Sequence, residues 1–205
     1  MFTGLVQTIG TVIDSEPTPA GRCLRIQAEW CAAISHGDSI SVSGCCLTVA
    51  NEPVADGGPG VLDFDVVHET LARTVLGGFQ AGARVNLETS CTPTTMLGGH
   101  VVQGHVDGVG TVKAVTSDGE WRVAVGAPCD LMPCITPKGS VTVDGVSLTV
   151  AAVDTDAECF ELALIPVTLE KTTLGGLRVG DRCNLETDIL ARTVVHWLSH
   201  YQGRD

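Results

Sequence analysis

The strongest constraint on the fold is that the chain contains the same unit twice. Three segments of the first half return in the second half, in the same order and at nearly constant offset. The pairs are 4–12 with 104–112, 39–50 with 140–151, and 69–89 with 167–187. In the last pair ETLARTVLGGFQAGARVNLET becomes VTLEKTTLGGLRVGDRCNLET. Such agreement indicates a tandem duplication of a unit of about ninety residues.

The duplication divides the chain into two domains, residues 1–89 and 97–187. The stretch between them, SCTPTTM (90–96), has the Pro and Thr content of a linker. Two long copies do not make a solenoid, so we expect two compact domains. Residues 188–205 lie outside the repeats and form a third part.

The sequence of each unit predicts β structure. The chain is 44% hydrophobic but only 4% aromatic and contains 24 glycines, a composition typical of short strands and tight turns. In SVTVDGV (140–146) apolar and polar residues alternate, and the Asp-Gly at 144–145 predicts a tight turn or a bulge. A short helix ended by glycines is predicted at 70–78 and at 168–176. Several short strands with one helix predict a small closed barrel.

The stretch DILARTVVHWLSHY (188–201) predicts an amphipathic helix. Asp188 is a suitable N-cap. The apolar residues of the stretch fall on one stripe that must pack on a barrel or on copies of itself. They are Leu190, Val194, Trp197, Leu198 and Tyr201. We favour self-association.

Charge and composition exclude several function classes. A formal net charge of −12 argues against a nucleic-acid partner, which needs clustered basic residues. No apolar run approaches the ~20 residues of a membrane-spanning helix, and the first residues lack the pattern of a secretion signal. Nine cysteines without a paired metal spacing favour free thiols in a cytoplasmic protein. No metal site is predicted.

Duplicated domains tend to bind similar ligands, so positions that differ between the copies are informative. Such differences would let two like molecules take unequal roles, one as donor and one as acceptor. The differing pairs are Leu5 and His105, Gly37 and Lys138, Ser43 and Asp144, Cys46 and Ser147, and Glu69 and Val167.

Several motifs together resemble the riboflavin synthase family of the trimeric alpha-chain type. They are MFTGLV, GCCLTV, GGHVVQGHVDGVGTV, PKGSVTVDGVSLTV and NLETDILAR, and they cover essentially the whole chain in order. The resemblance implies an all-β fold of two tandem six-stranded Greek-key barrels followed by a C-terminal helix that holds a homotrimer together. It implies a transferase that converts two molecules of 6,7-dimethyl-8-ribityllumazine into riboflavin and 5-amino-6-ribitylaminouracil without cofactor or metal.

In this family the active site lies between the N-terminal barrel of one subunit and the C-terminal barrel of its neighbour. Association of the trimer with lumazine synthase is a further partner that the resemblance allows.

The resemblance also implies site residues in each half. In the first half they are Phe2, Thr3, Gly4, Leu5, Val6, Ser39, Cys46, Leu47, Thr48, Asp65, Val66, Val67, His68, Glu69 and Thr70. In the second half they are Gly104, His105, Val106, Lys138, Ser147, Leu148, Thr149, Ala163, Leu164, Ile165, Pro166, Val167 and Thr168. The polar groups expected to transfer protons or activate a nucleophile are Ser147, His105, Cys46, Thr149, Asp144 and Asp188.

One of these positions departs from the family pattern, and the role of one further histidine stays open. Val167 stands where many family members carry a polar residue, which puts one contact of the second pocket in doubt. The role of His100 is left open, with a structural role at the domain junction favoured over a catalytic one.

Other readings remain. Each polar candidate has a structural alternative: a buried barrel histidine, ordinary strand residues, a core cysteine, a solvated lysine, a turn-forming Asp144 and a helix-capping Asp188. A non-catalytic lumazine- or flavin-binding paralogue would carry the same barrels. A flavin oxidoreductase would need a G-x-G-x-x-G loop in a βαβ unit, and GHVDGVG does not fit that pattern.

Overall fold

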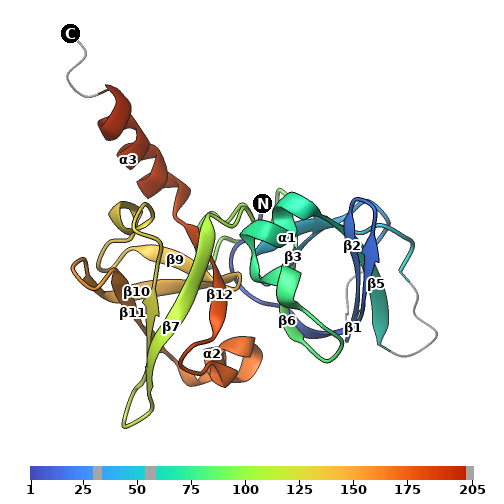
Figure 1. Ribbon diagram of the computed structural model, residues 1–205, viewed down its shortest axis with the longest axis horizontal. Coiled ribbons are helices and arrows are strands. Elements are labelled where there is room, and N and C mark those ends of the chain that lie inside the picture. The colour runs from blue at the N-terminus through green and yellow to red at the C-terminus, as the bar shows by residue number, and fades with distance from the viewer. Residues whose placement is uncertain (30–33, 54–58, 202–205) are drawn as a thin grey trace.

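A computed structural model describes residues 1–29, 34–53 and 59–201. It consists of two β-barrels side by side and one helix that projects from the second barrel (Figure 1). The polypeptide within the described ranges is mostly β, as the repeats predict.

The first half forms a six-stranded antiparallel sheet in the order β4-β3-β6-β1-β2-β5. Its strands are β1 (Thr8–Thr18), β2 (Gly21–Ala28), β3 (Ser39–Val42), β4 (Cys45–Thr48), β5 (Gly60–Val67) and β6 (Arg84–Thr89). The last strand returns to lie beside the first, as in a Greek key. A bridge between Val49 and Phe64 brings the two ends of the sheet together. Alternate residues point inward, so Leu24, Ile26 and Val85 are fully buried.

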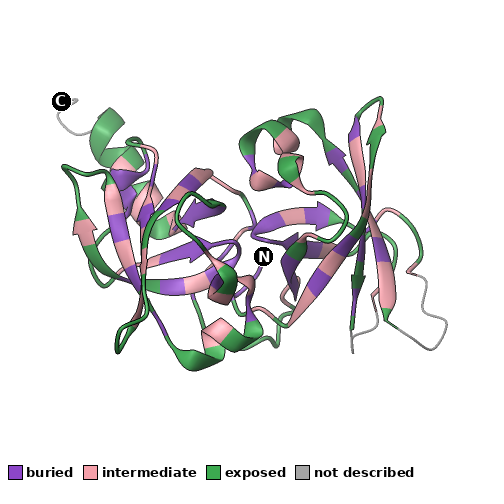
Figure 2. Ribbon diagram, turned by 60° about the horizontal axis from the view of Figure 1, so that its bottom comes forward, coloured by how far each residue is buried: buried purple, intermediate pink, exposed green. Residues whose placement is uncertain are grey.

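The second half repeats this pairing in a closed barrel, β10-β11-β8-β7-β12-β9. Its strands are β7 (Gly108–Thr116), β8 (Trp121–Gly126), β9 (Ser140–Val143), β10 (Val146–Asp154), β11 (Cys159–Leu164) and β12 (Arg182–Thr187), with a 3₁₀ turn, η2 (Met132–Cys134), before β9. Its core centres on Phe160 and the inward valines of β8 and β9. Figure 2 shows this burial along the strands of both barrels.

The helices predicted at 70–78 and 168–176 form, but each is divided in two. The first is α1 (His68–Arg73) followed by the 3₁₀ turn η1 (Val75–Gly78), and the second is α2 (Pro166–Lys171) followed by η3 (Thr173–Gly176). The break falls at Thr74 and Thr172, whose extended backbones let their hydroxyls accept from the N–H of Leu76 and Leu174.

The C-terminal helix α3 (Ile189–Tyr201) stands on the second barrel and has no buried residue. Asp188 caps it, because its Oδ1 accepts the Leu190 N–H at 2.9 Å. No helix in the described ranges is both long and apolar enough to cross a membrane.

The two barrels meet at their hairpin turns. Ser43-Gly44 and Asp144-Gly145 all have positive φ, as a two-residue type I′ turn requires. The tight turn predicted at Asp144-Gly145 is therefore confirmed. A Cβ on Gly44 would lie 2.7 Å from the Gly145 nitrogen, and a Cβ on Gly145 would lie 2.6 Å from the Gly44 nitrogen. The turns pack backbone against backbone, which only glycine permits here.

A reciprocal pair of asparagines bonds the halves around these turns. Asn86 Nδ2 donates to the Asp144 carbonyl at 2.9 Å, and Asn184 Nδ2 donates to the Ser43 carbonyl at 2.7 Å. Their Oδ1 atoms accept the N–H groups of Thr173 and Val75, both at 2.8 Å. Each asparagine is buried on one barrel and satisfied by the other, so the two barrels form one body.

Asp144 is buried within this junction. Its Oδ1 accepts the Asn184 N–H at 2.8 Å, and burial raises the pKa of its carboxyl from 3.8 to about 7. Between about pH 4 and 7 the folded protein therefore holds a proton that the unfolded chain has released. Stability from this group is present at low pH and is lost as the pH rises through that window.

Asp144→Asn tests this linkage. Asparagine keeps an oxygen for the Asn184 N–H and tolerates the positive φ, but it cannot ionise. Between pH 5 and 7.5, the free energy of unfolding of wild type should fall relative to that of the variant by about 1–3 kcal/mol. Urea titrations at several pH values measure the difference. The exposed Asp118→Asn should track wild type, and parallel curves for all three proteins would contradict the linkage.

Candidate functional site

The segments that precede the first strand of each barrel are exchanged between the halves. Phe2 and Val102 pair in antiparallel fashion, each N–H donating to the other's carbonyl, at 2.7 and 3.1 Å. Beyond this pair, Ser147 N–H donates to the Gly4 carbonyl and Cys46 N–H donates to the Gly104 carbonyl, both at 2.8 Å. Each segment therefore lies beside the other half's site residues.

This arrangement differs from the sequence-based grouping, which assigned each segment to the pocket of its own half. Val6 packs against the core of the second barrel, and Val106 packs against the core of the first. The structure thus brings Gly4, Leu5 and Val6 to Ser147, and it brings Gly104, His105 and Val106 to Cys46. Repeat alignment shows which residues are equivalent, but it does not show which barrel a segment crosses to.

Two buried carboxylates hold the exchanged segments. Glu88 accepts hydrogen bonds from the N–H and hydroxyl of Thr3, both at 2.7 Å, and from the Gly4 N–H at 3.0 Å. Glu186 accepts from the N–H groups of Gln103, Gly104 and His105 at 2.7, 2.9 and 3.1 Å. Burial raises the pKa of both glutamates, that of Glu186 to about 6, although these hydrogen bonds oppose the shift.

Ser147 meets a histidine that the sequence assigned to structure. His100 Nδ1 lies 2.7 Å from Ser147 Oγ, and its Nε2 is buried without a partner among the described residues. Burial lowers the pKa of His100, and the Asp188 carboxylate partly opposes this shift. The imidazole is therefore neutral near pH 7 and can accept the serine proton.

The other polar candidates of the second half, Thr149, His105 and Asp144, lie in three different parts of the structure. Thr149 lies on β10 two residues after Ser147, so both side chains share the outer face of the strand. His105 is exposed and held through its backbone. Asp144 is not brought to Ser147: it lies in the junction, beside a groove between the barrels.

The backbone of Lys138 is in the left-handed region, which residues with a side chain rarely adopt. Its φ is +67°, and its N–H donates to the Val150 carbonyl at 2.8 Å. In the first half Gly37 has the same role, with a φ of +89° and a 2.9 Å bond to the Val49 carbonyl. A lysine at a position where glycine is less strained makes Lys138 a candidate site residue.

The first-half candidates lie on β4 and on the segment that joins β5 to α1. Cys46 and Thr48 alternate outward on β4, Leu47 points into the core, and Ser39 pairs with Thr48. The segment Asp65–Thr70 ends β5 and begins α1; within it Val66 is buried, while Asp65, Val67, His68 and Glu69 are exposed.

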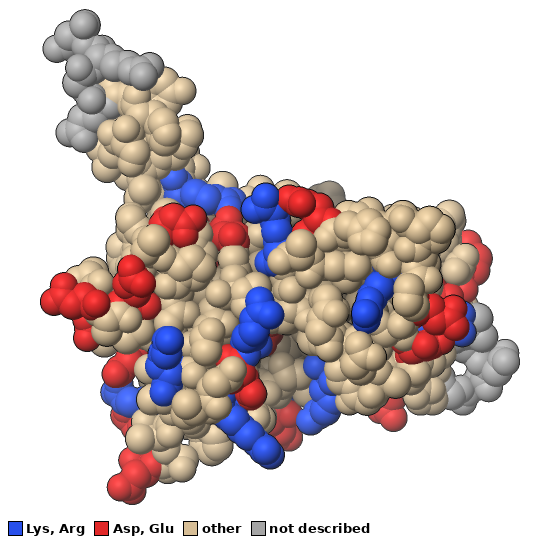
Figure 3. Space-filling view, viewed as in Figure 1, with Lys and Arg blue, Asp and Glu red and all other residues tan. Residues whose placement is uncertain are grey.

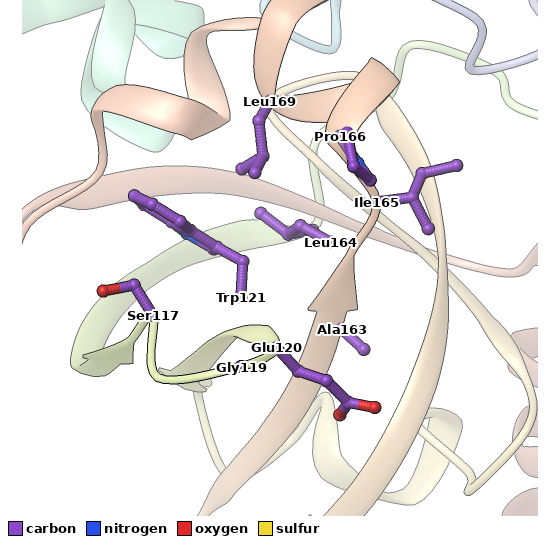
Figure 4. A pocket seen from close by; sticks show the side chains of 9 residues that line it. All are labelled: Ser117, Gly119, Glu120, Trp121, Ala163, Leu164, Ile165, Pro166 and Leu169. Atoms are coloured by element: carbon purple, nitrogen blue, oxygen red, sulfur yellow. The ribbon is translucent and has the colours of Figure 1, made fainter.

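The matching segment of the second half, Ala163–Thr168, borders a cleft of about 400 Å³ beneath α2. Figure 4 shows the ring of Trp121 facing Leu164 and Leu169 across it. Leu148 is buried in the core, whereas Ile165 and Val167 are exposed. Among the described residues, no group of three or more His, Cys, Asp or Glu side chains is placed to hold a metal ion.

The sequence missed two kinds of residue that the structure places at the site. His100 has no counterpart in the first copy, and its partner lies 47 positions away, so repeat comparison gave no signal. Glu88 and Glu186 did leave a signal, because NLET occurs in both halves, but the pattern alone does not show that these glutamates are buried.

Comparisons with known proteins agree with this architecture. The lumazine binding domain family matches residues 3–90 and again residues 103–188. Riboflavin synthase of Mycobacterium bovis is 43% identical over 197 residues, which cover 95% of this chain and 96% of the relative. Riboflavin synthase of Brucella abortus is 39% identical over 98% of this chain and 100% of the relative.

Solved structures show the same fold. LumP complexed with riboflavin superposes with a TM-score of 0.77 at 26% identity, covering 91% of this chain and 99% of that one. LumP complexed with 6,7-dimethyl-8-(1'-D-ribityl) lumazine gives a TM-score of 0.76 at 24% identity over the same shares. With the full-length relatives and the duplicated domain, these matches show that the chain belongs to the riboflavin synthase family and is built from two lumazine-binding domains.

Proposed function

We propose that the protein is a riboflavin synthase. It transfers four carbons between two molecules of 6,7-dimethyl-8-ribityllumazine, giving riboflavin and 5-amino-6-ribitylaminouracil. The observation that carries this proposal is the match to riboflavin synthases over nearly the whole chain, and the pair formed by Ser147 and His100 supplies the candidate chemistry.

In this reaction the protein mainly has to position the two lumazine molecules and to transfer protons. The C7 methyl of the lumazine is acidified by its electron-poor ring, so a modest base suffices. Holding two rings face to face contributes roughly 7–11 kcal/mol through proximity. The two barrels supply two equivalent ring sites, with residues 1–89 and 97–187 as the binding domains.

In this proposal Ser147 is the activated nucleophile of the second pocket. Neutral His100 accepts the Ser147 hydroxyl proton, and the oxygen adds to C7 of the acceptor lumazine. Asp188 lies near enough to act on the charge of His100, which stabilises the imidazolium formed. Thr149, His105 and Cys46 supply further proton donors and acceptors, Cys46 from the opposing pocket.

We propose that the active protein is a homotrimer with each site shared between subunits. The support is helix α3, which projects from the barrels with an exposed apolar stripe (Figure 1). Trp197 and Val194 are each 58% exposed, and Leu190 is 69% exposed. An apolar stripe of this kind is suited to burial against copies of itself. Cytoplasmic location and association with lumazine synthase remain expectations of the family.

The alternative is a paralogue that binds lumazine or flavin without turning it over. Mixing the purified protein with the lumazine and following riboflavin by absorbance separates the two. Turnover supports the enzyme, whereas tight binding with no riboflavin formed refutes it.

Ser147→Ala and His100→Gln test the chemical step. Each removes one member of the pair, so kcat should fall by roughly 10²–10⁴, with KM changed less than about threefold. His100→Gln should also flatten the acid limb of the pH–rate profile. The exposed Ser199→Ala and His36→Gln are the matched controls. A rise in KM at unchanged kcat would assign both residues to positioning.

Lys138→Gly and Lys138→Ala separate the backbone strain at this position from a role of the lysine ammonium in binding substrate. Both remove the ammonium, so both should lower kcat/KM by about tenfold if it holds substrate. Glycine also relieves the positive φ, so it alone should raise the free energy of unfolding by about 0.5–1 kcal/mol. Wild-type kcat/KM in both variants would remove Lys138 from the site.

Removal of residues 188–205 tests the shared site. The truncated protein should elute as a monomer with no riboflavin synthesis, as measured by light scattering and turnover. Trp197→Glu in the full chain provides a milder disruption of the same stripe and should weaken assembly and activity together. An active monomer would refute the arrangement.

A further inference from the structure

A second cleft lies beneath helix α1, at the boundary between the barrels. Its volume is about 510 Å³. Its lining residues come from β2, α1, the η1 turn and the first residue of β12. They are Arg22, His68, Leu71, Ala72, Thr74, Gly77, Gly78 and Arg182.

The charged groups in this lining are all basic. Arg22 donates one hydrogen bond, from Nη1 to Ser15 Oγ at 3.0 Å, which leaves its other donors available. The guanidinium of Arg182 makes no ion pair or side-chain hydrogen bond with any described residue. His68 Nε2 lies 3.4 Å from the Pro19 carbonyl, so Nδ1 is left for another partner.

Nearby acids are engaged elsewhere. Glu69 forms its ion pair with Arg73 on the exposed side of α1, and neither residue lines the cleft. Asp181 precedes Arg182 and lines with it the groove between the barrels, but its carboxylate accepts the Arg178 N–H at 2.8 Å and it does not line the cleft. The positive charge in the cleft is therefore not neutralised by its lining.

The second half contains a cleft at the corresponding helix, and its lining includes Glu120 and no basic side chain. Arg22 lies opposite Val66 on β5, and Trp121 lies opposite Leu164 on β11. Val66 and Leu164 both stand two residues before a helix, so Arg22 and Trp121 are equivalent.

By the same offset His68 corresponds to Pro166, which lines the cleft of Figure 4 beside Trp121. The same fold thus forms with a tryptophan and a proline at these places. Packing therefore does not demand Arg22 or His68 in the first half, whereas Arg182 has a basic counterpart in Arg84.

The basic lining of the cleft is opposite in sign to the net charge of the chain. The chain carries a formal net charge of −12. In Figure 3, Lys and Arg side chains lie over the boundary between the barrels, among Asp and Glu side chains that are also found toward the edges. A cleft lined by one sign of charge focuses the electric field and raises the local concentration of anions.

We propose that the cleft beneath α1 is an anion site that takes the phosphate of a phosphate monoester or free phosphate. Arginines from both barrels line the cleft, a guanidinium can donate two parallel hydrogen bonds to phosphate oxygens, and Gly77 and Gly78 leave one wall without side chains.

Two sources of phosphate fit this chemistry. One is free inorganic phosphate. The other is the 5′-phosphate of a ribityl chain seated in the first barrel, since His68 belongs both to the cleft and to the segment proposed to hold the ribityl group. Only this second source rests on the proposed function.

Calorimetric titration with inorganic phosphate, at constant ionic strength set by chloride, tests the site. Arg22→Gln and Arg182→Gln should each weaken binding about tenfold, the loss expected for one charge-assisted contact. Arg73→Gln removes the same charge from the outer side of α1 and should stay within about twofold of wild type. Absence of saturable binding, or equal weakening in all three variants, overturns the proposal.

Riboflavin and riboflavin 5′-phosphate distinguish the sources. Tighter binding of the phosphorylated ligand by about tenfold, lost in Arg22→Gln, identifies the ribityl phosphate. Equal binding of the two ligands, with saturable binding of inorganic phosphate, identifies free phosphate. Lumazine turnover is measured separately: a wild type that binds phosphate but makes no riboflavin refutes the proposed function and leaves the anion site standing.

Discussion

The exchange of the two leading segments is the constraint on which the site depends. Each segment is held to one barrel by a buried glutamate and bonded to the other barrel through a glycine carbonyl. A buried carboxylate is costly unless hydrogen bonds satisfy it, and each glutamate accepts three. Because segment and carboxylate satisfy one another, neither barrel can complete its site alone.

This constraint explains why β6 and β12 are buried on both faces. Their inward residues, such as Leu87 and Leu185, fill the cores. Their outward residues follow an Asn-x-Glu pattern: the asparagine bonds the opposite hairpin turn, and the glutamate holds a leading segment. One strand per barrel thereby carries both the interface and the support of the site.

The sequence predicted the parts of this structure that are local or repeated. The duplication, the alternating strands, the turn at Asp144 and the cap at Asp188 follow from short-range patterns. The crossing of Val6 and Val106 into opposite cores did not follow, because pairing partners across a sheet leave no local signature. The bond between His100 and Ser147 was missed for the same reason.

The copies agree where the fold needs them and differ where chemistry can act. Asn86 and Asn184 occupy equivalent positions of the two repeats and are identical, as are the two glutamates. At other equivalent positions the repeats differ: Cys46 corresponds to Ser147, and Gly37 corresponds to Lys138. His100 lies outside the repeated segments, and among the described residues no histidine is hydrogen-bonded to the Cys46 side chain. An ancestor with two equal pockets would bind two lumazines alike. In the function proposed above, His100 and Lys138 would give the two pockets unequal roles.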